Sequence, residues 1–141
     1  MLVVVEPGTT AGYERILLAR DSVIRAGGSV LAPCPHDNAC PLPAGDWCHF
    51  SVRLARTRSH RAAKGAERGF EDEKLSYVAL TRFPQPQTRA SARVLRRPEL
   101  HRGHVVLELC ATNGLERRTV SRKDGQLYKQ ARKLSWGDAL L

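Results

Sequence analysis

The chain has 141 residues, 42% of them hydrophobic, and a formal net charge of +9. This length allows one core of moderate size but not two ordinary domains, and the apolar content excludes a disordered tail. No apolar run approaches the ~20 residues that cross a bilayer, and the first residues lack the features of a signal peptide. The sequence therefore predicts a soluble, cytoplasmic protein with no membrane partner. A mitochondrial location would require a preceding segment that carries a transit peptide.

Residues 1–33 predict a β-α-β unit of an α/β sheet. The apolar run Leu2 to Val5 is typical of a strand buried on both faces of a parallel sheet. Helical spacing of apolar residues follows over 12–26, and two glycines stop it. Ser29 to Ala32 forms the second predicted strand.

Ligand sites in open α/β sheets lie beyond the carboxyl ends of the strands. Glu6 follows the first predicted strand and Cys34 follows the second, so we expect the two loops to face the same edge. Glu6 is the one candidate for a catalytic residue. Its alternative role is to brace the turn before the helix.

The four cysteines predict a metal centre. Cys34, Cys40 and Cys48 have the spacing C-x5-C-x7-C, and Cys110 follows after 61 further residues. Prolines at 33, 35, 41 and 43 restrict the loop around the first two thiols. The spacing is looser than that of ordinary zinc knuckles, and the residues alone leave zinc and an iron–sulfur cluster both open.

Disulfides are disfavoured, because thiols stay reduced in the cytosol. His36 and His49 lie beside the cysteines. Since four thiols already complete a ligand set, we expect the two histidines to hydrogen-bond to ligands or to contact RNA.

The positive charge belongs to the second part of the chain. Residues 1–50 hold three basic and five acidic residues, whereas 51–141 hold 20 basic and nine acidic residues. Arginine clusters suit a polyanion, because a guanidinium can bind phosphate through two parallel hydrogen bonds. A solvated basic face is the alternative. The candidate RNA contacts are the first basic group: Arg53, Arg56, Arg58, Arg61, Lys64 and Arg68.

Beyond the cysteine loop, the pattern predicts a basic, mostly helical arm over 50–68 and a helix over 71–82, followed by a loop over 83–87. Strands are expected over 92–95 and 104–110, with turns at Asn113-Gly114 and Asp124-Gly125. We therefore divide one domain into three parts: 1–33, 34–69 (the cysteine-rich loop and basic arm) and 70–141 (a helix and a β-rich basic segment).

Several unusual segments carry a family resemblance. EPGT at 6–9, APCPHDNACPL at 32–42, DWCHF at 46–50, FEDEKLSY at 70–77 and ARKLSWGD at 131–138 resemble the small-subunit ribosomal Rsm22 family of methyltransferase-like proteins. The resemblance implies a class I S-adenosylmethionine (SAM) methyltransferase-like, Rossmann-like fold. It also implies association with small-subunit ribosomal RNA and a [4Fe–4S] cluster held by Cys34, Cys40, Cys48 and Cys110.

The chain departs from this family because it contains no glycine-rich turn such as G-x-G-x-x-G for the methyl donor. We therefore expect the C-terminal portion of the family's domain, with SAM bound only if a separate N-terminal half supplies its site. The predicted function is an iron–sulfur, rRNA-associated factor of small-subunit assembly. A SAM-dependent rRNA methyltransferase is the alternative, and a structural zinc protein is the third possibility.

Overall fold

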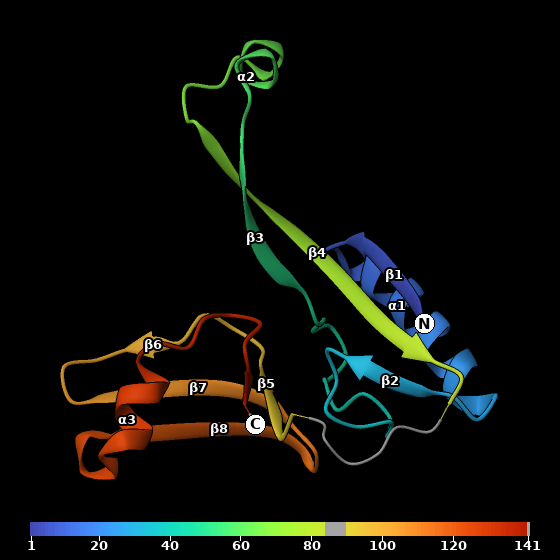
Figure 1. Cartoon of the computed structure of the whole chain (residues 1–141), viewed down its shortest axis with the longest axis vertical. Coiled ribbons are helices and arrows are strands. Elements are labelled where there is room, and N and C mark those ends of the chain that lie inside the picture. The colour runs from blue at the N-terminus through green and yellow to red at the C-terminus, as the bar shows by residue number, and fades with distance from the viewer. Residues whose placement is uncertain (84–89, 141) are drawn as a thin grey trace.

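The computed structural model describes residues 1–83 and 90–140, which form two β-sheets and a projecting arm (Figure 1). The first part of the chain builds one sheet and the arm from β1 (Leu2–Pro7), α1 (Thr10–Arg25), β2 (Ser29–Ala32), β3 (Phe50–Ala55), α2 (Arg58–Lys64) and β4 (Phe70–Thr81). The second sheet follows, with β5 (Ala92–Val94), β6 (Glu99–Leu100), β7 (His104–Ala111), β8 (Gly114–Ser121), the 3-10 turn Arg122–Asp124, α3 (Gln126–Ala131) and β9 (Ala139–Leu140).

Strand β4 is the centre of the first sheet, because it is paired along both edges. β1 pairs with one edge from Leu2↔Leu80 to Pro7↔Leu75. On the other edge, β2 pairs near the end of β4, and β3 pairs with its first half. All three ladders are antiparallel, so β1 and β2 run in the same direction with β4 between them. The predicted strand-helix-strand unit is thus present, but the predicted parallel pairing is not.

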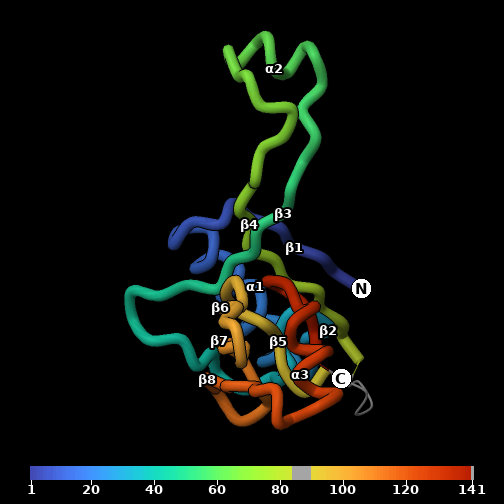
Figure 2. Tube along the Cα trace, turned by 90° about the vertical axis from the view of Figure 1, so that its left-hand side faces the viewer, coloured from blue at the N-terminus to red at the C-terminus, as the bar shows by residue number. Residues whose placement is uncertain are grey.

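The helix predicted over 71–82 is wrong, since those residues lie almost entirely in β4. The predicted helical arm is also largely wrong. It is a β-hairpin of β3 and the first half of β4, and α2 is its helical tip. Figures 1 and 2 both show this hairpin rising away from the two sheets.

Helix α1 covers one face of the first sheet. Ile16 packs there against buried Val30, Val78 and Leu80. The Thr9 side chain caps the helix by accepting a hydrogen bond from the Gly12 amide at 3.1 Å. The backbone at Gly12 passes so near the Pro7 carbonyl that a Cβ there would lie 2.1 Å from its oxygen. This close approach fixes the turn between β1 and α1.

The second sheet confirms the strands expected in the last third. Its order is β6-β7-β5-β9, with β8 paired along the whole length of β7 on the opposite edge, and all its ladders are antiparallel. The β7–β8 hairpin turns at the expected Asn113-Gly114, and the 3-10 turn precedes the expected Gly125. The core consists of Ala92, Val94, Val105, Leu107, Leu109, Val120 and Ala131.

Within the described residues, no helix has the length and apolar character that crossing a membrane requires. Of the loop predicted over 83–87, only Phe83 lies inside the described residues.

Candidate metal centre and basic arm

The segment 33–49 connects β2 to β3 and carries three of the four cysteines. Both strands pair with the same edge of β4, so the segment begins and ends beside this strand. Cys110 comes from β7 of the other sheet. All four thiols are free and line one pocket, with Cys110 buried and the other three half-buried. The structure therefore brings together the four cysteines that the sequence singled out.

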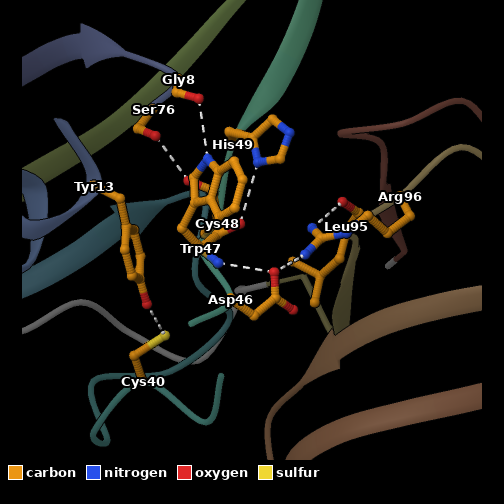
Figure 3. A network of polar contacts seen from close by, with 10 residues as sticks. All are labelled: Gly8, Tyr13, Cys40, Asp46, Trp47, Cys48, His49, Ser76, Leu95 and Arg96. Carbon is orange, nitrogen blue, oxygen red and sulfur yellow. Dashed lines mark hydrogen bonds and ion pairs between the residues drawn. The ribbon is translucent and has the colours of Figure 1, made fainter. Parts of the chain in front are cut away.

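Hydrogen bonds hold this loop against the first sheet (Figure 3). The Trp47 indole donates to the Gly8 carbonyl at 3.0 Å, and the buried Ser76 hydroxyl donates to the Cys48 carbonyl at 2.7 Å. Asp37 accepts from the Val30 amide at 2.8 Å. The loop has no helix or strand of its own, and these contacts fix its course.

A second set of contacts joins the loop to the other sheet. Arg96 forms an ion pair with Asp46, and the Nε2 atom of His36 lies 3.6 Å from the Cys110 sulfur. His36 therefore lies beside one of the four cysteines, as the first of the two roles expected from the sequence requires. His49 is also buried, stacked on Trp47 with ring centroids 5.0 Å apart and edge-on to Trp136. Burial lowers the pKa of His49, so this ring is a packing element and is not an exposed RNA contact.

The thiols of Cys34, Cys48 and Cys110 lie where ionisation is unfavourable. Burial raises the pKa values of Cys34 and Cys48, and it raises the pKa of Cys110 to about 12. The neighbouring thiols raise these values further. The Tyr13 hydroxyl lies 3.0 Å from the Cys40 sulfur, and burial is the main cause of its own raised pKa. A metal at this site would therefore have to displace protons from the thiols.

Two guanidinium groups line the same pocket, and sequence reasoning missed both. Arg20 of α1 is 2% exposed and donates to the His36 and Asn38 carbonyls. Arg93 of β5 donates to the Pro33 carbonyl at 3.0 Å and the Gly137 carbonyl at 2.9 Å. Both groups lower the pKa of the Cys34 thiol, against the larger effect of burial. Arg20 could have been noticed in the sequence, because it falls on the apolar face of its helix, four positions after Ile16.

The chemistry of the donor set fits a soft metal centre, because four thiols line one pocket whose other side chains are largely apolar. In the described residues, no group of three or more His, Cys, Asp or Glu side chains is arranged to hold a metal ion. The pocket encloses about 30 Å³, room for roughly one or two water molecules. Binding of a cluster would therefore require the pocket to widen, and the segment 33–49 contains no helix or strand that such a change would break.

The arm carries the six predicted RNA contacts, but half of them have acidic partners. Arg53 makes two hydrogen bonds to Asp72, at 2.7 and 2.9 Å, and its guanidinium lies 4.1 Å from the centre of the Phe70 ring. Glu71 accepts from Arg56 at 2.8 Å and from Lys64 at 3.2 Å. These bonds, first that from Arg56, lower the pKa of Glu71 to about 2.

The remaining three candidates, Arg58, Arg61 and Arg68, have no ion pair with a described residue. Arg58 and Arg68 are exposed, and Arg61 is half-buried. They lie on α2 and on the turn that leads to β4. Within the arm, the positive charge that has no acidic partner among the described residues is therefore at the tip.

Glu6 lies at the end of β1, where its carboxylate forms an ion pair with Arg15 at 2.8 Å. The hydrogen bond from Arg15 lowers the pKa of Glu6. This contact joins β1 to α1, which is the bracing role that the sequence left as an alternative.

Comparisons with known proteins cover the whole chain. Residues 1–141 match the family model described as mitochondrial small ribosomal subunit Rsm22. The chain is 34% identical over 155 residues to the human ribosome assembly protein METTL17, mitochondrial, an alignment that covers 99% of this chain and 32% of the relative. It is 28% identical over 183 residues to Rsm22-cox11 tandem protein 2, mitochondrial, of Schizosaccharomyces pombe, covering 98% of this chain and 24% of the relative. The chain thus spans about a third or less of the length of these relatives.

The expected cytoplasmic location is wrong. The matching family is described as mitochondrial, and both relatives carry that word in their names. These findings point to mitochondria.

Proposed function

This chain belongs to the family described as mitochondrial small ribosomal subunit Rsm22, and on that premise we propose that it works in assembly of the mitochondrial small ribosomal subunit. In this proposal the chain binds an iron–sulfur cluster through its four cysteines and contacts ribosomal RNA through its basic arm. The human relative is named a ribosome assembly protein, and the alignment covers nearly all of this chain. Because that alignment covers 32% of the relative, the activity of the full-length relative is part of the proposal.

The observation that carries the cluster is the meeting of all four cysteines at one pocket. Three thiols come from the loop beside the first sheet and the fourth from β7 of the second. Such a set suits zinc as well as iron and sulfide. The resemblance of the cysteine-bearing segments to the Rsm22 family supports the [4Fe–4S] cluster over zinc. When bound, the cluster would join the two sheets through its ligands.

The RNA contact is supported by the arm. The outer end of the β3–β4 hairpin projects away from the rest of the molecule, and the arginines at its tip have no ion pair with a described residue (Figure 2). Such an arm can reach the phosphates of a folded RNA. The methyltransferase alternative gains no support, because Glu6 is bound by Arg15 and the sequence has no glycine-rich donor turn.

Substitution of Cys110 tests the cluster ligands. We expect Cys110→Ser to lose most of the iron and acid-labile sulfide that the wild-type chain carries after anaerobic purification, because a distant ligand is removed from the set. Leu115→Ser is the matched control, since Leu115 pairs with Cys110 across the same hairpin and is 47% exposed. Equal iron content in Cys110→Ser and wild-type protein would show that Cys110 is not a ligand.

A further inference from the structure

We infer that Arg20 and Arg93 are the counter-charges of the four-cysteine centre. Arg20 comes from α1, which packs on the first sheet, and Arg93 comes from β5 of the second sheet. The two guanidinium groups stabilise the negative charge of the bound cluster and thereby set its reduction potential. This inference rests on the proposed cluster and assigns a role to residues that are not ligands.

The burial of Arg20 is the first observation. Its side chain is 2% exposed, and its one carboxylate partner among the described residues is Asp21, at 2.9 Å, whose side chain is 49% exposed. Its Nε atom is buried without a hydrogen-bond partner in the described part of the chain. A buried guanidinium with an unused donor is unfavourable unless a charged or polar group in its surroundings compensates it. Arg20 lines the same pocket as the four thiols.

Arg93 reaches the same pocket from the second sheet. Its hydrogen bonds go to two backbone carbonyls, and it has no carboxylate partner in the described residues. Carbonyl oxygens orient a guanidinium but do not neutralise it. The charge of Arg93 is therefore available to the pocket, and its bond to Pro33 aims it at the residue next to Cys34.

The composition of the pocket wall gives the third observation. Among the residues that the structure describes, the side chains that line it include four thiols and two guanidinium groups but no carboxylate. Four thiolates around an oxidised [4Fe–4S] core carry a net charge of about −2, and reduction adds one more negative charge. The two arginines match the charge of the oxidised centre and favour the addition of the electron.

The reduction potential tests this charge role. We expect Arg20→Gln and Arg93→Gln each to lower the potential of the anaerobically loaded protein, measured by redox titration followed by electron paramagnetic resonance. Arg20→Lys and Arg93→Lys keep the charge and should restore most of the potential. Arg25→Gln is the control, because Arg25 is exposed at the end of α1 and does not line the pocket. Its potential should equal that of the wild type.

Unchanged potentials in both glutamine variants would overturn the inference while leaving cluster binding intact. If the glutamine variants fail to load iron, recovery of loading in the lysine variants supports the charge role. Equal failure of the lysine and glutamine variants contradicts it, because shape alone would then explain the loss. A wild-type chain that loads neither iron nor sulfide would overturn the proposed cluster and this inference together.

Discussion

Ser76 ties the cysteine loop to the central strand of the first sheet. Its side chain is 1% exposed, and its hydroxyl donates to the carbonyl of Cys48 at 2.7 Å (Figure 3). The bond connects a paired strand to a segment that has no regular structure. A small residue outside the metal centre thus fixes the backbone of one of its proposed ligands.

We expect Ser76→Ala to lower the free energy of unfolding by about 1 kcal/mol, because the Cys48 carbonyl loses its donor. Urea denaturation at neutral pH measures this change. Ser51→Ala is the control, since Ser51 is half-buried on β3 and its hydroxyl has no described partner. Equal stability of both variants would contradict the role given to Ser76.

At the residue scale, the sequence allowed the cysteines to be found but not their charged neighbours. Cysteine, proline and histidine in one short segment are rare enough to predict a site. An arginine is common on surfaces, so its position on the buried face of α1 is a weak indication. Arg93 is harder still, because only the pairing of β5 with β7, at Arg93↔Cys110, brings it to the fourth thiol.

At the element scale, β4 shows how pairing overrides local preference. The acidic residues at 71–73 suit a helix start, and the spacing of Leu75, Val78 and Ala79 suits a helix face. In the structure Ser76, Val78 and Leu80 instead alternate as the buried positions of a strand. Strands β1, β2 and β3 form backbone hydrogen bonds with the two edges of β4, and these bonds between strands would be lost if β4 were a helix. The sequence does not show that alternation, because Tyr77 and Ala79 between the buried positions are apolar as well.

The acidic residues predicted to begin a helix serve the arm instead. Glu71 joins α2 to the hairpin through Arg56, Lys64 and His60. Because its pKa falls from 4.5 to about 2, its contribution is full above pH 4.5 and is lost as the pH falls through about 2.

We therefore expect a carboxyl titration of Glu71, followed by nuclear magnetic resonance, with a midpoint near pH 2. The amides of α2 should lose protection over the same range. Glu67, exposed and without an ion pair to a described residue, is the internal comparison. A midpoint for Glu71 near its ordinary value would show that these ion pairs do not hold the arm in solution.

Removal of the unpaired arginines tests the arm as an RNA contact. Arg58→Ala, Arg61→Ala and Arg68→Ala combined should weaken binding to a small-subunit rRNA transcript, because phosphate contacts are lost. The dependence of affinity on salt should become shallower, by a slope of roughly 0.7 to 0.9 for each lost contact. Fluorescence anisotropy over a salt series measures both quantities.

The control removes the same number of charges elsewhere, at Arg25, Lys123 and Lys133, which are exposed and have no ion pair with a described residue. If both triple variants weaken binding equally, net charge explains the effect and the arm has no special role.

At the scale of the whole molecule, no strand pairing between described residues joins the two sheets. The described contacts between them include Arg96 with Asp46, Arg93 with Pro33 and His36 with Cys110, all of which involve the cysteine loop. The proposed centre has three ligands from this loop and one from the second sheet. Cluster binding should therefore stabilise the two sheets as one unit.

The sequence predicted the α/β class, singled out the four cysteines that line one pocket, and predicted the basic character of the arm. The predicted cytoplasmic location was wrong because it rested on the absence of a targeting segment from this chain. The chain covers 32% of its human relative. The prediction of parallel pairing in the first sheet was wrong for a different reason. The observed antiparallel pairing arises because β4 lies between β1 and β2, and no local sequence pattern encodes that position.

Native mass spectrometry of the anaerobically purified chain tests the central claim most directly, because it counts the metal and sulfide atoms bound to each chain. The account predicts one cluster of about four irons and four sulfides per wild-type chain, with much less in Cys110→Ser. A chain that carries a single zinc ion and no iron, under conditions that assemble clusters, would contradict it.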